Sequence, residues 1–162
     1  MDEAPYFHVA FLVRSLDEAM PRFSSVLGVS FLTPRNFELE HFVDVAHFGD
    51  DTPRPWSGRA VYSRQGPPFY ELVEAKGQGI FSLDGREEGF HHVGMFVDNS
   101  HETALMMADQ GVSPGAKILG ADGRARVTFT APADFHGLRL ELLDSTSNAL
   151  KEILEEIAKG DR

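Results

Sequence analysis

The chain has 162 residues, no cysteine, and 25 acidic against 15 Lys and Arg side chains, which gives a net charge of −10 at pH 7. The lack of cysteine excludes disulfides, zinc–thiolate sites, iron–sulfur clusters and cysteine nucleophiles. The acidic balance argues against nucleic-acid binding, because proteins of that class present basic surfaces to the phosphates.

The hydrophobic content of 42%, with thirteen Phe, is sufficient for the interior of one compact unit or of two small modules that share a core. No apolar run approaches the ~18–20 residues of a membrane helix, so we expect no membrane-spanning segment. The N-terminal sequence Met-Asp-Glu-Ala-Pro is acidic and lacks the basic and apolar regions of a secretory signal. We therefore expect a cytoplasmic protein.

The first half of the chain begins with a strand signal, which a capped helix follows. Ser15 offers the N-cap, Glu18 offers the capping-box partner three residues later, and Gly28 is a natural helix stop. The expected elements of this first module, residues 1–75, are a strand at 6–13, a helix at 16–27, one or two strands within 29–48, a loop at 49–58, and a hairpin of strands at 59–64 and 68–75.

The second half repeats this order of elements. Residues 76–88 are rich in Gly and charge and read as a linker. The expected elements of the second module, residues 89–144, are a strand at 91–97, a helix at about 100–110, and strands near 116–119, 125–130 and 138–144. Each half is thus β-α-β-β-β. The tail, residues 145–162, is predicted to form an amphipathic helix with one apolar face, made of Leu150, Ile153, Leu154 and Ile157.

The two halves also repeat each other residue by residue. FHVAFLV in the first half matches HHVGMFV in the second, and FYELVE matches RLELLD. Superposing the halves places His8 on His92 and Glu71 on Glu141. Alternation along the strands puts all four on one face, opposite a face that is almost purely apolar and should lie under the helices. Two imidazoles and two carboxylates form a ligand set that suits a divalent metal.

Two alternatives to a metal remain open at this point. Buried carboxylates are costly unless they are paired, hydrogen-bonded or bound to metal, and two Glu–His ion pairs across the sheet would meet that need. Alternatively, Glu141 pairs with Arg139 or with an arginine from outside the strand. A single Glu–His pair would favour these alternatives, whereas the duplication of the pair at matching positions favours a metal.

Most of the remaining residues of interest are expected to have structural roles or to lie on the surface. Alternation points Phe7 and His91 toward the helices, and His91 is interpreted as a structural histidine. Surface exposure is the safer interpretation of Glu38 and Glu40, with an additional inward-facing acid or base as the alternative, and His136 is a candidate for the border of the site. Two groups of cations are candidates for binding a small anion, against the alternative of solvated surface charge: Arg54, Arg59 and Arg64, and Lys117, Arg124 and Arg126.

These motifs resemble the vicinal oxygen chelate superfamily, which includes glyoxalase I, methylmalonyl-CoA epimerase, extradiol dioxygenases and the fosfomycin and bleomycin resistance proteins. The resemblance covers nearly the whole chain through residue 144 and rests on FHVAFLV, the Leu-Gly after the first helix, PPFYELVEA, HHVGMFVDN and GLRLELLD. It implies an α+β glyoxalase-like fold, in which two βαβββ modules form a cupped mixed sheet with the helices outside, around one divalent metal. By this likeness the metal ligands are His8, Glu71, His92 and Glu141, and the ion is Zn, Co, Ni, Mn or Fe.

Within the superfamily, the sequence is most similar to the epimerase-like branch. The turn GADG followed by VTFTAP is similar to the glycine turn, strand and proline of the epimerases. Leu12 and the segment Glu74-Ala75-Lys76 stand where glutathione-dependent glyoxalases carry Arg and Asn, which argues against glutathione as a cosubstrate.

The resemblance and the ligand set together predict an isomerase, epimerase or lyase that transfers a proton alpha to the carbonyl of a small carbonyl compound or acyl thioester. The metal would stabilise the enolate as a Lewis acid, and Glu141 or Glu71 would be the catalytic base. An Fe(II)-dependent dioxygenase and a non-catalytic drug- or metabolite-binding protein are the alternatives. The apolar tail helix and the sheet edges expected of paired modules also predict a homodimer.

Overall fold

The computed structural model describes residues 6–159, and within this range it does not describe the side chains of Ala149 and Leu150. The first module contains β1 (Tyr6–Val13), α1 (Leu16–Leu27), β2 (Arg35–Asp44), α2 (Val45–Phe48), β3 (Arg54–Tyr62) and β4 (Phe69–Glu74). The second contains β5 (Gly89–Val97), α3 (Ser100–Asp109), β6 (Pro114–Leu119), β7 (Ala125–Thr130), the 3-10 turn η1 (Pro132–Asp134) and β8 (Leu140–Asp144), and α4 (Asn148–Lys159) follows.

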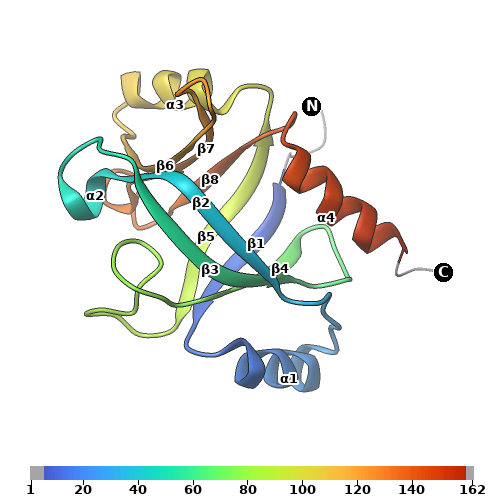
Figure 1. The fold of residues 1–162 in the computed structure, drawn as a ribbon. Coiled ribbons are helices and arrows are strands. Elements are labelled where there is room, and N and C mark those ends of the chain that lie inside the picture. Colours follow the sequence, from blue (N-terminus) through green and yellow to red (C-terminus); the bar gives the residue numbers. More distant parts are fainter. Residues whose placement is uncertain (1–5, 160–162) are drawn as a thin grey trace.

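The eight strands form one closed sheet in the order β1-β4-β3-β2-β6-β7-β8-β5, and the helices lie outside it (Figure 1). β1 pairs in parallel with β4 of its own module and antiparallel with β5 of the other, while β5 pairs in parallel with β8. β2 and β6 make the second joint between the modules. The predicted glyoxalase-like fold is confirmed, and the four strands that carry the candidate ligands are neighbours.

The first helix is formed as its sequence predicts. The Ser15 side chain accepts a hydrogen bond from the Glu18 backbone N–H, and Gly28 ends the helix in the left-handed conformation with φ of 70°. An N-cap oxygen of this kind satisfies one of the amides that a helix start leaves unpaired, and glycine adopts positive φ without steric cost. Asn99 caps α3 in the same way, through the Glu102 N–H.

The expected loop at 49–58 is wrong in its second half, because β3 begins at Arg54. Pro53, Pro55 and Gly58 gave this stretch the composition of a loop. Trp56 therefore lies on a strand, paired with Leu39 of β2. The region 29–48 contains one strand and the single-turn helix α2.

Phe7 is the exception to the predicted alternation. The ladder between β1 and β5 shifts register between Tyr6 and His8, and such a bulge turns one side chain to the opposite face. Phe7 is 2% exposed and its ring lies 5.3 Å from that of Phe69 and 5.0 Å from that of Phe96. It belongs to the interior of the barrel and not to the face under the helices.

The segment predicted as a linker contributes to the core. Ile80 and Phe81 are buried, and the Phe81 ring lies 4.8 Å from Trp56 and 5.5 Å from Phe129. Because these two rings belong to different modules, the segment fills the space between the modules instead of merely joining them.

The C-terminal helix α4 packs on the barrel of its own chain. Ile153 is 4% exposed and belongs to the main core, and Arg35 of β2 forms ion pairs with Glu152 at 3.7 Å and with Glu156. The Leu150 side chain, which the sequence places on the same face, lies outside the described residues. No helix in the described part of the chain is both long and apolar enough to cross a membrane.

The closed sheet bears on the expected homodimer. None of the eight described strands is left at a free edge, so one of the two reasons for expecting a dimer is absent from this fold. The other reason was the apolar face of the tail helix, and that face is used at least in part within the chain. The homodimer stays a prediction.

Candidate metal centre

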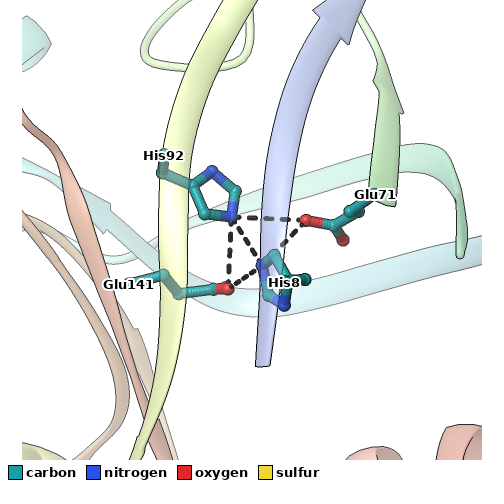
Figure 2. Close-up of side chains that lie close together, drawn as sticks. All are labelled: His8, Glu71, His92 and Glu141. Carbon is teal, nitrogen blue, oxygen red and sulfur yellow. Dashed lines mark hydrogen bonds and ion pairs between the residues drawn. The ribbon is translucent and has the colours of Figure 1, made fainter. Parts of the chain in front are cut away.

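Four neighbouring strands bring the predicted ligands together, as Figure 2 shows. Ala10 of β1 stands opposite Glu71 of β4 on one side and His92 of β5 on the other. Gly94 of β5 likewise stands between His8 of β1 and Glu141 of β8. His8, Glu71, His92 and Glu141, here called the quartet, all face the interior, which confirms the face that alternation predicted.

The quartet converges on one point. His8 Nε2 lies 3.0 Å from His92 Nε2, 3.2 Å from Glu71 Oε2 and 2.9 Å from Glu141 Oε2. His92 Nε2 lies 3.3 Å from Glu71 Oε2 and 3.2 Å from Glu141 Oε2. All four residues are buried, with at most 8% of their surface exposed, and their ligand atoms lie within 4.8 Å of one another.

This geometry fits a divalent metal. An ion about 2.0–2.2 Å from nitrogen and oxygen ligands places neighbouring ligand atoms roughly 3 Å apart, as the contacts above are. The Oε2 atoms of Glu71 and Glu141 are buried, and among the described residues neither has a hydrogen bond of acceptable geometry. Oxygens that are close to nitrogen but poorly aligned with it are aimed at a shared centre rather than at a donor.

The charges within the quartet attract one another. Burial by itself would lower the pKa of His8, but the carboxylates of Glu71 and Glu141 outweigh it and raise that pKa to about 10. Burial would raise the pKa of both glutamates, and the two imidazoles outweigh it and lower both values. The metal-free quartet is therefore a network of ion pairs, which is the alternative that the sequence left open. A metal would take the place of the imidazole protons.

Gly94 is required for the position of His8. A Cβ atom on Gly94 would lie 2.2 Å from the His8 ring, well inside van der Waals contact. The corresponding residue of the first module is Ala10, also small, at the matching crossing of strands. The small residues in FHVAFLV and HHVGMFV thus leave room for the rings.

His91 orients His92 from behind. Nε2 of His91 lies 2.7 Å from the carbonyl oxygen of Ile80, which only accepts, and 3.0 Å from Nη1 of Arg139, which only donates. The shorter of these two contacts favours a proton on Nε2, donated to Ile80. Nδ1 of His91, 2.8 Å from Nδ1 of His92, is then the acceptor, and His92 donates to it. This arrangement leaves the Nε2 lone pair of His92 free for a metal. A metal-bound histidine typically donates its other N–H in this way.

His91 stays neutral in this position. Burial, followed by the charges of His92 and Arg139, lowers the pKa of His91 to about 3. Arg139 Nη1 lies 3.0 Å from the His91 ring, so Arg139 contacts His91 and is not the partner of Glu141. His8 has no such support, because among the described residues its buried Nδ1 has no hydrogen-bond partner.

An apolar cavity of about 200 Å³ lies against the quartet. Of the quartet, Glu71, His92 and Glu141 line it, whereas His8 does not. Tyr62 lines it as well, and burial, with the charges of Glu71 and Glu141 added, raises the pKa of Tyr62 well above its usual value. The phenol is therefore neutral and offers a hydrogen-bond donor at the polar end of the cavity.

With the exception of Arg126, the other candidates from the sequence lie away from the cavity. Glu38, Glu40 and His136 are exposed, as the safer interpretation held for the two glutamates. The two cation groups do not form anion sites with free charge, because most members are paired with carboxylates: Arg54 with Asp50, Arg59 with Glu74 and Asp17, Lys117 with Asp51, Arg124 with Glu102, and Arg126 with Asp122 and Asp144.

Comparison with known proteins places this geometry in context. Residues 7–129 match the family model described as the Glyoxalase/Bleomycin resistance protein/Dioxygenase superfamily. No curated protein matches the chain.

Several solved structures share the fold at low sequence identity. A hypothetical protein from Bacillus halodurans C-125 is 20% identical with a TM-score of 0.61, over 88% of this chain and 95% of that one. Methylmalonyl-CoA epimerase from Streptomyces coelicolor, in complex with 2-nitronate-propionyl-CoA, is 18% identical with a TM-score of 0.60, over 88% and 96%. The epimerase from Mycobacterium tuberculosis is 17% identical with a TM-score of 0.60, over 91% of each chain.

Proposed function

Because the chain belongs to the Glyoxalase/Bleomycin resistance protein/Dioxygenase superfamily, we propose that it is a metal-dependent isomerase, epimerase or lyase that transfers a proton alpha to a carbonyl. One observation carries this proposal: two carboxylates and two imidazoles converge at the polar end of an otherwise apolar cavity. The described epimerase neighbours support this class of reaction without fixing the substrate.

The quartet would hold one divalent ion, of Zn, Co, Ni, Mn or Fe. When bound, the ion supplies Lewis-acid stabilisation of negative charge on a substrate oxygen. The neutral Tyr62 phenol donates a hydrogen bond to the same region. By accepting a hydrogen bond from Nδ1 of His92, His91 leaves the Nε2 lone pair of His92 directed at the centre, where it would bind the ion.

The proton is moved by a glutamate. Glu71 and Glu141 approach the centre from different strands, on opposite sides of the two imidazoles (Figure 2). One carboxylate oxygen accepts the proton from the carbon next to the carbonyl, and a glutamate returns it. Return to the other face of the same carbon is epimerisation, and return to the neighbouring carbon is isomerisation. The apolar wall of the cavity excludes water from the reacting carbon.

Deuterium exchange tests the proposal. Zinc-loaded protein is incubated in deuterated water with acyl thioesters and 2-hydroxy or 2-oxo carbonyl compounds, and label uptake is read by mass spectrometry. Glu141→Gln and Glu71→Gln should each lower uptake, the residue that acts as the base by about 10²-fold or more. Glu38→Gln, an exposed glutamate on β2, is the control and should leave uptake unchanged. Wild-type exchange in both quartet variants would show that neither glutamate is the base.

The two rival functions predict different metals. Protein purified without added metal should contain Zn, Co, Ni or Mn if proton transfer is the function. Iron together with oxygen consumption would support the dioxygenase, which needs open positions for oxygen beside its ligands. No bound metal, with retained affinity for a flat ligand, would support the non-catalytic binding protein.

A further inference from the structure

The cavity beside the quartet has a size and a wall that the proposed reaction does not explain. Its volume is about 200 Å³. Since an apolar cavity of roughly 150 Å³ accommodates one benzene molecule, this cavity has room for one ring with small substituents. Beyond the polar end its wall is apolar and includes Phe37, Trp56, Phe81, Val127, Phe129 and Ile153.

A chain of aromatic rings leads from the far wall to the candidate metal centre. The Trp56 ring lies 4.8 Å from Phe81, Phe81 lies 5.5 Å from Phe129, and Phe129 lies 5.4 Å from His92. Gly58 makes room for the indole, because a Cβ atom there would lie 2.1 Å from it. Rings spaced in this way favour edge and offset contacts with another flat ring.

No described Lys or Arg side chain of the cavity wall is free to bind an anionic substrate. Among the described residues that line the cavity, Arg126 is the one cation, and it pairs with Asp122 at 2.9 Å and with Asp144 at 3.8 Å. With a divalent ion in place, the carboxylates of Glu71 and Glu141 balance its two charges, so the loaded quartet has no net formal charge. In the part of the cavity away from the ion, a carboxylate or phosphate would lose hydration on entry without gaining a salt bridge to a side chain.

Helix α4 forms one side of the cavity. Ile153 lines the cavity while it is 4% exposed, and Ser147, just before the helix, lines it too. The ion pairs of Arg35 with Glu152 and Glu156 fasten the helix to β2. A long substituent directed at this side would meet the body of the helix, shown in red beside the barrel in Figure 1.

We infer that the substrate is a compact, uncharged carbonyl compound that carries a flat apolar ring, and that Ile153 of α4 sets the limit of its size. The inference rests on the proposed function for the reacting carbonyl group. The size, the lack of charge and the flat ring of the substrate are inferred from the cavity. It distinguishes this chain from the epimerase neighbours, which are described in complex with acyl-CoA compounds.

Three probes of zinc-loaded protein test the substrate class by titration calorimetry. 2-Hydroxyacetophenone is uncharged and aromatic, benzoylformate has a similar skeleton with a carboxylate, and propionyl-CoA is long and anionic. The first should bind at least about tenfold more tightly than either of the others. Equal or tighter binding of benzoylformate or propionyl-CoA would overturn the inference.

A pair of variants on α4 tests the size limit. Ile153→Trp fills the cavity and should weaken binding of 2-hydroxyacetophenone by about tenfold or more, with zinc content unchanged. Leu154→Trp, at a neighbouring position that is 40% exposed, should have no effect. If Ile153→Trp does not fold, Ile153→Ala serves instead and should improve binding of the naphthyl analogue relative to the phenyl compound. Unchanged binding in a folded Ile153 variant would remove Ile153 from the substrate site.

Label uptake on 2-hydroxyacetophenone and propionyl-CoA, the two probes that carry a proton alpha to the carbonyl, separates this inference from the proposed function. Tight binding of 2-hydroxyacetophenone without metal-dependent exchange would overturn the proton-transfer proposal and support the substrate class. Exchange on propionyl-CoA alone would support proton transfer and overturn the substrate class.

Discussion

Zinc binding by this protein should release protons and tighten as the pH rises. The carboxylates of Glu71 and Glu141, against the effect of burial, raise the pKa of His8 from 6.5 to about 10, and they raise the pKa of His92 as well. At about pH 7 metal-free His8 is therefore protonated, and zinc must displace that proton. Three pH units below the pKa, at about 1.4 kcal/mol for each unit, the proton opposes metal binding by about 4 kcal/mol. The apparent affinity should rise at least about tenfold for each pH unit between roughly pH 7 and 9.

Calorimetric titration with zinc in buffers of different ionisation enthalpy measures this release directly. We expect about one proton or more per zinc near pH 7. The Glu71→Gln/Glu141→Gln double variant removes the charges that raise the two histidine pKa values, so burial should dominate and proton release should fall. An affinity that is flat with pH, together with no proton release in the wild type, would refute the assignment of His8 as a protonated partner of the carboxylates.

The stability of the metal-free protein gives a second readout of the same linkage. Because its pKa is raised in the folded state, His8 contributes to the free energy of unfolding. This contribution is fully present below about pH 6.5 and is lost as the pH rises through about 10. The glutamate pKa values are lowered from 4.5, so their contribution is present above that pH and is lost as the pH falls. Thermal melting of metal-free protein should therefore show its highest midpoint between these limits.

Three further predictions concern the ligands, their support and the assembly. The His8→Ala/His92→Ala double variant should fold and lose its metal, and wild-type metal content by elemental analysis would contradict the assignment of the ligands. His91→Phe keeps the stacked ring beside Phe81, which lies 5.2 Å away, but removes the acceptor for His92, so the zinc affinity should fall about 10–100-fold; unchanged affinity would show that His91 does not orient its neighbour. Light scattering should show a homodimer at micromolar concentration, and a species of 17.9 kDa would contradict it.

The convergence of the quartet was predictable because it depends on local rules. Alternation fixes which face each strand residue takes, and the repeat fixes which residues correspond. With β1 and β5 adjacent, His8 and His92 meet without further information. The helix boundaries of α1 followed in the same way from Ser15 and Gly28, because caps act over a few residues.

The parts that the sequence did not predict depend on contacts between distant segments. Phe81 packs between the modules because the barrel leaves a space there, and nothing in residues 76–88 shows that space. The bulge that turns Phe7 inward arises from pairing between β1 and β5, so it is absent from the alternation of β1 alone. Trp56 was assigned to a loop because its neighbours Pro55 and Gly58 resemble a turn, whereas the pairing of β3 with β2 overrides that local preference.

The site is less symmetric than the sequence repeat, because His8 and His92 have different surroundings. His92 lines the cavity and is held from behind by His91, while the matching residue behind His8 is Phe7, which offers no hydrogen bond. His8 is instead enclosed by the rings of Phe7 and Tyr62, at 5.2 and 5.4 Å, and does not reach the cavity. Duplication accounts for the four ligands, whereas the cavity reaches the quartet at His92 and not at His8. In the sequence, this difference between the modules is indicated by His91-His92 in β5, where β1 has Phe7-His8.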